Sequence, residues 1–346
     1  MTLNTPAHSL LAPIRAGWNL GNSLDAMKRG LKPGEYVLPR ETETTWRNPP
    51  VTRSLIHSVC NAGFGSVRVP VTWIQHLNDE GKVDPRWMDR VAEVVHWVLD
   101  EGMLCLLNVH HDAGCHGWLQ ATDESYTVFG ERFEKLWKQI ASRFADEGER
   151  LVFEAFNELL DGRGHWTQTE NDSAYDIHNR WNQLFVDVVR STGGNNATRV
   201  LSLQTYSAGH SARTLAAFRM PEDTVLGRII LQVHNYDPQG FCWLRAENHE
   251  IRNTWGTEAD LNQIDMLMTA LSAFAEKHQA PVIIGEFGSE DKQNTDERLR
   301  HAAYVAGKAR EKGIVCFWWD CGYFALFDRH TGKLIQPGIT GSLLCR

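Results

Sequence analysis

Short apolar runs alternate along this chain with longer segments in which apolar residues return every three or four positions. Apolar runs of about four to eight residues are typical of buried strands, and the longer spacing is typical of helices with one buried face. The pattern predicts eight strands, within residues 14–21, 66–70, 103–109, 151–153, 199–205, 228–235, 281–285 and 313–319. Helices are predicted within residues 52–63, 87–99, 133–144, 173–190, 211–218, 258–278 and 296–312.

The predicted strands are apolar nearly throughout rather than alternating, as expected for a parallel sheet that is covered on both faces. Repeated strand–helix units form either an open doubly wound sheet or a closed barrel. No GxGxxG, GxxxxGKS or GxxxxGKT motif follows the early strands, so a nucleotide-binding open sheet has no support. Eight units favour an α/β fold, a single (β/α)8 TIM barrel, and we expect one domain over residues 1–346.

The charge and composition of the chain argue against nucleic acid and membranes as its main partners. The formal net charge of −8 argues against nucleic acid as the main partner. No apolar run approaches the length of a membrane-spanning helix, so no membrane partner is expected. The segment after Met1 lacks a basic region and a long apolar run, so no signal peptide is expected within this chain. The seven cysteines include no CxxC pair and predict no disulfide framework.

Polar and aromatic side chains follow the predicted strands. In a TIM barrel the functional site lies at the carboxyl ends of the strands. The residues delivered there are Trp18, Asn19, Asn22, Arg68, His110, His111, Asp112, Asn157, Glu158, His234, Asn235, Tyr236, Glu286 and either Trp318 or Trp319. A regular strand would turn only one of the two tryptophans inward.

Two of these residues, Glu158 and Glu286, end apolar runs that lie far apart in the sequence. A buried carboxylate is costly unless it has partners or a chemical role. A pair of them suits hydrolysis of an acetal, in which one protonates the leaving oxygen and the other attacks the anomeric carbon or activates water. Arg68 beside Glu286 would keep that group ionised, and a drier setting would raise the pKa of Glu158. Tyr236 could donate a hydrogen bond to a nucleophilic carboxylate.

Other interpretations of the same residues stay open. Arg68 would also suit an ion pair inside the barrel, and His110 or His111 a hydrogen-bonded core position. The ligands of a metal-dependent hydrolase would come from His110, His111, Asp112 and His234. An HHD triplet without HxH or HExxH gives that alternative little support. A third interpretation is a non-catalytic carbohydrate-binding barrel, although both candidate carboxylates and their Arg, Tyr and His partners are present in the sequence.

The chain resembles glycoside hydrolase family 5, and within it the subfamily 4 endo-β-1,4-glucanases. The resemblance rests on stretches that occur in register over nearly the whole chain. They are GWNLGNSLDA (17–26), TWRNPPVT (45–52), GFGSVRVPVTW (63–73), NVHHD (108–112), FEAFNEL (153–159), VHNYDP (233–238), IIGEFGS (283–289) and the pair FWWDCG and LFDR within 317–329.

By this resemblance, Glu158 is the acid/base and Glu286 the nucleophile, and Asn157 would hold the 2-hydroxyl of the sugar in the −1 subsite. Arg68 and Tyr236 would contact Glu286, and His234 would lie near Glu158. The other residues placed around the substrate are Asn22, His110, His111, the strand-eight Trp319 and the loop residue Trp46. A one-residue shift would put Trp318 in the place of Trp319.

The resemblance implies a retaining endo-acting hydrolase that cleaves internal β-1,4-glucosidic bonds of cellulose, mixed-linkage β-glucan or related polysaccharides, with carboxyl groups about 5–5.5 Å apart. Endo-β-mannanase, xylanase or xyloglucanase activity on the same scaffold stays open. No cofactor or metal, a β-glucan partner, a monomer and action outside the cytoplasm are expected. The sequence departs from the family pattern at Leu159, where proline is usual, and at Cys321, where asparagine is common.

Overall fold

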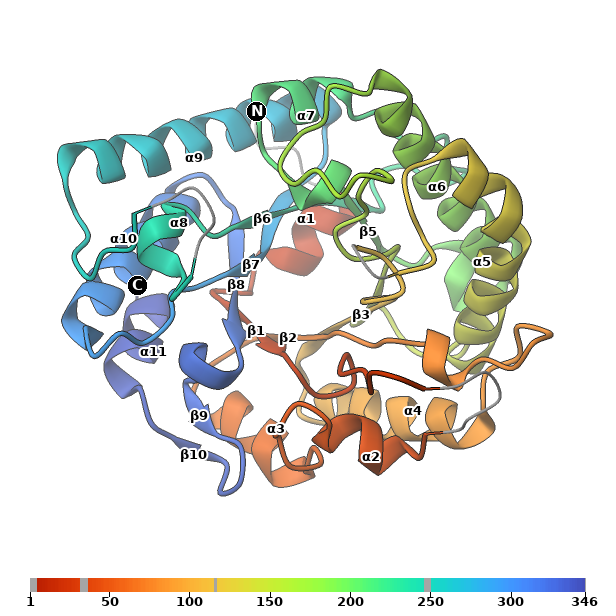
Figure 1. The fold of residues 1–346 in the computed structure, drawn as a ribbon, viewed down its shortest axis with the longest axis horizontal. Coiled ribbons are helices and arrows are strands. Elements are labelled where there is room, and N and C mark those ends of the chain that lie inside the picture. The colour runs from red at the N-terminus through yellow and green to blue at the C-terminus, as the bar shows by residue number, and fades with distance from the viewer. Residues whose placement is uncertain (1–4, 32–36, 115–116, 246–249, 346) are drawn as a thin grey trace.

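Eight parallel strands close into a barrel in chain order, and the last strand is hydrogen-bonded to the first. This computed structural model describes residues 5–31, 37–114, 117–245 and 250–345. The barrel strands are β1 (Gly17–Leu20), β2 (Ser66–Val69), β3 (Leu104–Asn108), β4 (Leu151–Glu154), β5 (Leu201–Gln204), β6 (Ile229–Asn235), β7 (Val282–Phe287) and β8 (Val315–Asp320). Helices surround the ring of strands, as Figure 1 shows, and the predicted α/β barrel is confirmed.

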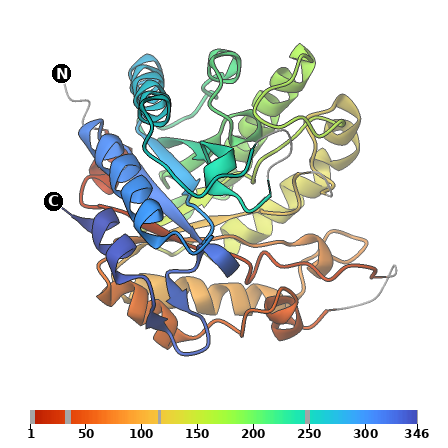
Figure 2. The same ribbon diagram turned by 60° about the vertical axis from the view of Figure 1, so that its left-hand side comes forward.

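Helices connect the strands and cover the outside of the barrel. They are α1 (Pro6–Leu11), α2 (Pro39–Thr44), α3 (Arg53–Asn61), α4 (Pro85–Asp100), α5 (Asp123–Arg143), α6 (Asp172–Ser191), α7 (Ala212–Ala217), α8 (Gln239–Cys242), α9 (Glu258–His278), α10 (Thr295–Glu311) and α11 (Pro337–Leu344). The last of them, α11, packs along α10 (Figure 2). No helix in the described ranges is both long and apolar enough to cross a membrane.

Short elements complete the chain. The strands β9 (Phe327–Asp328) and β10 (Lys333–Leu334) form an antiparallel hairpin after the barrel. The 3₁₀ turns are η1 (Ile74–His76), η2 (Gly194–Ala197), η3 (Tyr206–Ala208) and η4 (Gly322–Phe324).

The helix ends show where the sequence pattern was sufficient. Helix α9 has the predicted bounds, because a capping box of Thr257 and Asp260 starts it and Gln279, at φ 51°, ends it. Helix α5 begins at Asp123, well before the predicted start at residue 133, because its first turns carry few apolar residues. The helices α1, α2, α8 and α11 were not predicted, since eight or fewer residues rarely show a clear helical period, although α7, with six residues, was predicted.

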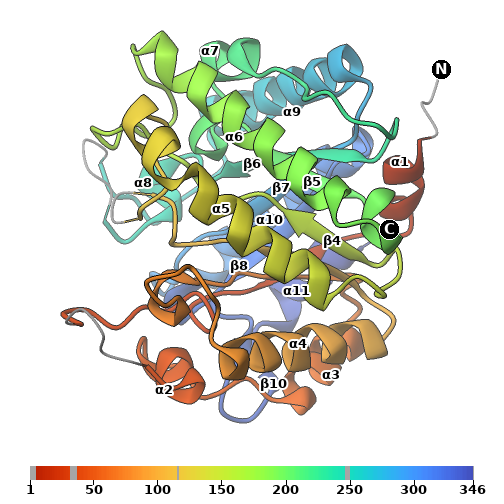
Figure 3. The ribbon, with the colours of Figure 1, turned by 90° about the vertical axis from the view of Figure 1, so that its right-hand side faces the viewer.

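The inside of the barrel changes character along its axis. Apolar side chains fill the end where the strands begin, and α1 closes that end with Ala7 and Leu11. Figure 3 shows α1 at the opposite end of the molecule from α8. Inward positions nearer the carboxyl ends of the strands are polar and fully buried: Asn19, Arg68, Asn108, Glu154, Gln204 and Gln232. The barrel therefore has an apolar floor and a polar upper layer on which a site can be built.

The floor is packed tightly enough for a single added methyl to be measurable. A Cβ at Gly17 of β1 would lie 2.1 Å from a ring carbon of Phe317 on β8. We therefore expect Gly17→Ala to lower the free energy of unfolding by about 1–3 kcal/mol in chemical denaturation, as overpacking does. Gly130→Ala is the control, since nothing lies within 4 Å of a Cβ there. Within helix α5 that change should be neutral or stabilising by about 0.5–1 kcal/mol, and equal effects at both positions would contradict the packing argument.

Candidate active site

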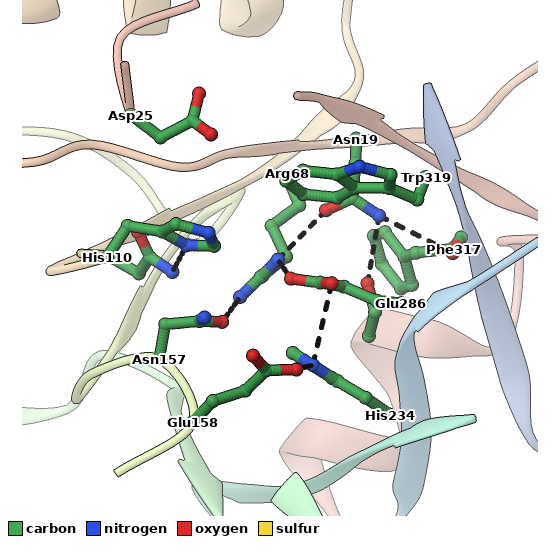
Figure 4. Close-up of polar contacts among 12 residues, drawn as sticks. Asn19, Asp25, Arg68, His110, Asn157, Glu158, His234, Glu286, Phe317 and Trp319 are labelled. Atoms are coloured by element: carbon green, nitrogen blue, oxygen red, sulfur yellow. Dashed lines mark hydrogen bonds and ion pairs between the residues drawn. The ribbon is translucent and has the colours of Figure 1, made fainter. Parts of the chain in front are cut away.

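The guanidinium of Arg68 lies at the centre of the polar layer and uses all five of its N–H groups. Figure 4 shows its contacts with Asn19, Asn157 and Glu286. Nε and Nη2 donate to the two carboxylate oxygens of Glu154, each at 2.7 Å. Nη1 donates to Glu286 at 2.6 Å and to Asn19 at 3.0 Å, and Nη2 also donates to Asn157 at 2.7 Å. One buried cation thus holds two carboxylates and two amides in fixed positions.

Both predicted roles of Arg68 are therefore present, since it contacts Glu286 and also forms an ion pair inside the barrel. The partner in that ion pair, Glu154, was missed by the sequence analysis. Burial opposes ionisation of Glu154, but the charge and hydrogen bonds of Arg68 bring its pKa below the usual value. The missed signal was a carboxylate two positions after Val152 in an otherwise apolar strand.

A change of register brings Glu286 into the barrel. Ile283 faces the interior, so regular alternation would turn Gly285 inward and Glu286 outward. The pairing of β7 with both neighbouring strands is irregular next to this position, which reverses the alternation. Phe287 then packs outward against Trp318, with ring centroids 5.3 Å apart. Glu286 belongs to the strand itself, whereas the predicted strand ended at residue 285.

Each oxygen of Glu286 has its own donor. Arg68 donates to Oε1 at 2.6 Å and Tyr236 donates to Oε2 at 3.0 Å. The Nδ1 atom of His234 lies 3.6 Å from Oε2. Burial and the nearby charge of Glu158 raise the pKa of Glu286 above its usual value, although His234 and Arg68 act in the opposite direction. These donors fix the orientation of the carboxylate and stabilise its ionised form.

Glu158 occupies a different environment just past the end of β4. Its backbone has φ 43°, a left-handed conformation that is strained for glutamate, and its N–H donates to Gln204 Oε1 at 2.7 Å. His234 Nδ1 lies 2.7 Å from Oε1 of its carboxyl group. Burial raises the pKa of Glu158 to about 7, against the opposing charge of Arg68. This carboxyl group is thereby suited to hold a proton near neutral pH.

The two carboxyl groups converge on one space. Single oxygens of Glu158 and Glu286 and a nitrogen of His234 all lie within 4.8 Å of one another. This is an atom-to-atom distance, and it is far below the roughly 6.5–9.5 Å separation that leaves room for an attacking water between two carboxyl groups. The spacing suits a reaction in which one carboxylate attacks a carbon directly while the other carboxyl group donates a proton to the leaving oxygen.

Hollows extend from both sides of Glu158. One cavity of about 730 Å³ is lined by His110, His234, Tyr236, Trp243, Glu286 and Trp319, among others. A second cavity of about 730 Å³ includes Trp46, Gln75 and the segment 27–31 in its lining. Both are lined by His111, Asn157, Glu158 and Trp166. An extended ligand can therefore lie across the pole of the barrel with the carboxyl pair near its middle.

The structure distinguishes the two adjacent tryptophans of β8. Trp319 lines the first cavity and lies parallel to His110, with ring centroids 5.8 Å apart. Its indole N–H donates to Cys321 Sγ at 3.0 Å, so its ring face rather than its N–H is offered to the cavity. Trp318 is fully buried and donates to the carbonyl of Phe324. Trp319 is thus the tryptophan that can contact a substrate.

The remaining predicted residues are divided between the cavities and the turns around them. Trp46 lines the second cavity and meets His111 edge to face, with ring centroids 5.3 Å apart. Asn22 lies in the turn after β1 at φ 56°, where its N–H donates to Asp25 and its carbonyl accepts from Asn48. Asn22 is not among the residues that line the two cavities.

The four residues named as possible metal ligands do not form one cluster in the described part of the chain, where His110 and His111 group with Asp25, and His234 groups with Glu158 and Glu286. Asp112 is buried and accepts from the backbone N–H of Trp73 at 2.7 Å and the indole of Trp118 at 2.8 Å. Asn108 donates both to Glu154 and to Nδ1 of His110, so Nε2 of neutral His110 carries the hydrogen and is a donor. A ring nitrogen in that state suits a sugar hydroxyl rather than a cation.

Comparison with known proteins places this geometry in context. The sequence profile of the cellulase family, glycosyl hydrolase family 5, matches residues 32–325. An endoglucanase A of Clostridium longisporum is 35% identical over 336 residues, which are 94% of this chain and 63% of that protein. The cellulase/esterase CelE of Acetivibrio thermocellus is 35% identical over 98% of this chain and 40% of that protein. The chain therefore spans less than two thirds of the length of these two relatives.

Solved structures resemble the whole barrel. A GH5-4 broad specificity endoglucanase of Ruminococcus champanellensis with bound cellotriose has a TM-score of 0.90 and 35% identity, over 100% of this chain and 99% of that one. A family 5 lichenase mutant of Caldicellulosiruptor sp. F32 with cellotetraose has a TM-score of 0.90 and 33% identity, over 99% and 95%. A family 5 enzyme of Prevotella bryantii with a xyloglucan tetradecasaccharide has a TM-score of 0.89 and 32% identity, over 99% and 98%.

Removing the central cation should destabilise the fold. We expect Arg68→Met to lower the free energy of unfolding at pH 7 by about 3–5 kcal/mol, because two buried carboxylates lose their partner. Arg68 holds the pKa of Glu154 low, so the loss should shrink as the pH falls and the variant's carboxyl groups bind protons. Urea denaturation measures both effects. Arg53→Met is the control, since Arg53 and Asp100 are 59% and 51% exposed and their pair contributes at most about 1 kcal/mol. Similar losses for both variants would contradict the central role of Arg68.

Proposed function

This chain belongs to the cellulase family, glycosyl hydrolase family 5, and we propose that it cleaves internal β-1,4 bonds of a β-glucan with retention of the anomeric configuration. The observation that carries the proposal is the pair of carboxyl groups, whose oxygens lie within 4.8 Å across a cavity that opens on both sides. Their surroundings differ, so one is suited to hold a proton and the other to stay ionised.

The reaction proceeds in two steps. Glu286 attacks the anomeric carbon while Glu158 gives its proton to the glycosidic oxygen, so the bond to the leaving sugar breaks and a glycosyl-enzyme ester forms. Ionised Glu158 then takes a proton from water, whose oxygen attacks the same carbon and releases Glu286 as a carboxylate. Glu158 ends protonated and Glu286 ionised, as both began.

The surrounding residues position these two groups. Arg68 and Tyr236 hold the carboxylate of Glu286 through separate oxygens, which directs it toward the substrate. Asn157 accepts from Arg68 through Oδ1, so its Nδ2 is the group that meets the carboxyl of Glu158 and still has a second N–H to donate to a sugar hydroxyl. The ring of Trp319 offers an apolar face to the same sugar. These are the roles that the family resemblance implies.

Substrate choice rests on the flanking hollows. Relatives of this chain are solved with cellotriose, cellotetraose and a xyloglucan oligosaccharide. The aromatic rings of Trp46, Trp166 and Trp243 lie along the cavities and suit the flat faces of β-linked glucose units. Because the relatives solved with sugars hold β-glucan oligosaccharides, we favour cellulose or mixed-linkage β-glucan over mannan or xylan. A polymer of this kind is met outside the cytoplasm, where we expect the enzyme to act as a monomer.

Loss of the nucleophile should abolish turnover. We expect Glu286→Gln to reduce release of reducing sugar from barley β-glucan or carboxymethylcellulose by roughly 10³-fold or more, because no glycosyl-enzyme forms. Glu311→Gln is the matched control, since Glu311 is exposed on the outside of α10. A Glu286→Gln enzyme with near wild-type turnover would overturn the assignment. A wild-type enzyme inactive on every β-glucan of a polysaccharide panel would overturn the proposed function.

The pH dependence should report the proton on Glu158. Its pKa is raised to about 7, and the acid must be protonated in the free enzyme. We therefore expect kcat/KM on β-glucan to fall about tenfold per pH unit above pH 7. An aryl β-cellobioside with a good leaving group needs no proton from the acid, so its first step should lose this dependence. The same alkaline limb with both substrates would show that another group controls it.

A further inference from the structure

Two buried glutamines meet the side of His234 that faces away from the carboxyl groups. Gln204 comes from β5 and Gln232 from β6, and both are fully buried. Their amide nitrogens lie 3.4 Å and 3.2 Å from Nε2 of His234. Neither glutamine lines the cavities described above, so neither is placed to contact a substrate directly. Their position raises the question of what they impose on the histidine.

The orientation of the Gln204 amide is determined by its other neighbours. Its Oε1 accepts the backbone N–H of Glu158 at 2.7 Å, and that partner can only donate. Its Nε2 donates to the carboxylate of Glu154 at 3.0 Å, and that partner is held ionised by Arg68. A reversed amide would oppose N–H to N–H and oxygen to carboxylate. Gln204 therefore presents its NH₂ group toward His234.

Gln232 is held in the matching orientation. Its Oε1 lies 2.9 Å from the hydroxyl of Ser202, which can either donate or accept. Because Gln204 already presents its NH₂ group to Nε2 of His234, that nitrogen is an acceptor, and Gln232 must face it with its own NH₂ group. The neighbouring strand makes room for this amide, because a Cβ at Gly285 would lie 2.4 Å from Nε2 of Gln232. Two amide groups with determined orientation thus face the same ring nitrogen.

A nitrogen that faces two N–H donors must accept. Nε2 of His234 consequently carries no hydrogen, and the proton of the neutral ring lies on Nδ1. That N–H points to Oε1 of Glu158 at 2.7 Å and lies 3.6 Å from Glu286. We propose that Gln204 and Gln232 are positioning residues that lock His234 as the neutral Nδ1–H tautomer, so that the acid/base always faces one fixed hydrogen-bond donor. The inference rests on the proposed role of Glu158.

The charges around the ring are consistent with this state. Arg68 from β2 opposes a second proton on His234, whereas Glu286 from β7 and Glu154 from β4 favour one. Tyr236 adds a phenol that stays neutral, since burial raises its pKa well above the usual value. On balance, burial lowers the pKa of His234 to about 4. Glu158 therefore faces a neutral donor instead of a cation, and a cation at this distance would favour loss of its proton.

The first test reads the histidine without any assay of activity. Long-range ¹H–¹⁵N spectra of the full chain, labelled at histidine, distinguish the two neutral tautomers from the imidazolium. The His234 signals are identified by their loss in His234→Gln. We expect the Nδ1–H tautomer throughout pH 5–8. An Nε2–H tautomer, or a titration of His234 inside that range, would overturn the proposal.

The second test changes the amide. In Gln232→Glu, a carboxylate replaces a donor beside Nε2, so His234 should become doubly protonated and the alkaline limb of kcat/KM should move down by about one pH unit or more. Gln263→Glu adds the same charge on the exposed face of α9 and should leave both readouts unchanged. Unaltered His234 signals in Gln232→Glu would overturn the role of Gln232.

Failure of the proposed function looks different from failure of this inference. A wild-type chain without hydrolase activity removes the function, while the spectra still report the tautomer. An active wild-type chain with the wrong tautomer removes only the inference.

Discussion

The structure depends on one buried cation, Arg68, whose single positive charge faces two carboxylates and two amide groups. Arg68 compensates for the burial of Glu154 and Glu286 together, and its planar shape sets the angle between them. Asn19 and Asn157 take the remaining N–H groups, so that strands β1, β2, β4 and β7 are tied through one side chain. The geometry of the reacting carboxylate is thus part of the same network that holds the barrel interior together.

The hydrophobic pattern predicted most of the barrel, because eight apolar runs separated by amphipathic segments are compatible with few other folds. The pattern could not show which side chains face inward, since strands covered on both faces are apolar throughout. Glu286 illustrates the difficulty, because it faces inward only through the irregular pairing of β7 with its neighbours. The short helices α1, α2, α8 and α11 were not predicted, since so few residues seldom show a clear helical period, and α7 is the exception among them.

The sequence predicted the site residues at strand ends but not those inside the strands. Residues at strand ends, such as Glu158 and His234, were identifiable because polar groups stand out where an apolar run stops. Glu154, Gln204 and Gln232 lie inside the runs, and their partners come from strands distant in the sequence. No local signal reports such a partner. Asn22 shows the converse, since a residue at the expected position can lie in a turn outside the cavity linings.

The short first helix gives the barrel a sealed bottom. With Ala7 and Leu11 it keeps solvent from the apolar floor, above which Arg68 and both reacting acids lie. Shortening the chain before residue 12 would expose this apolar floor to water and so lower the free energy of unfolding of the barrel. A segment at the far pole, which never meets a sugar, thereby helps to hold in place the strands that carry the reacting acids.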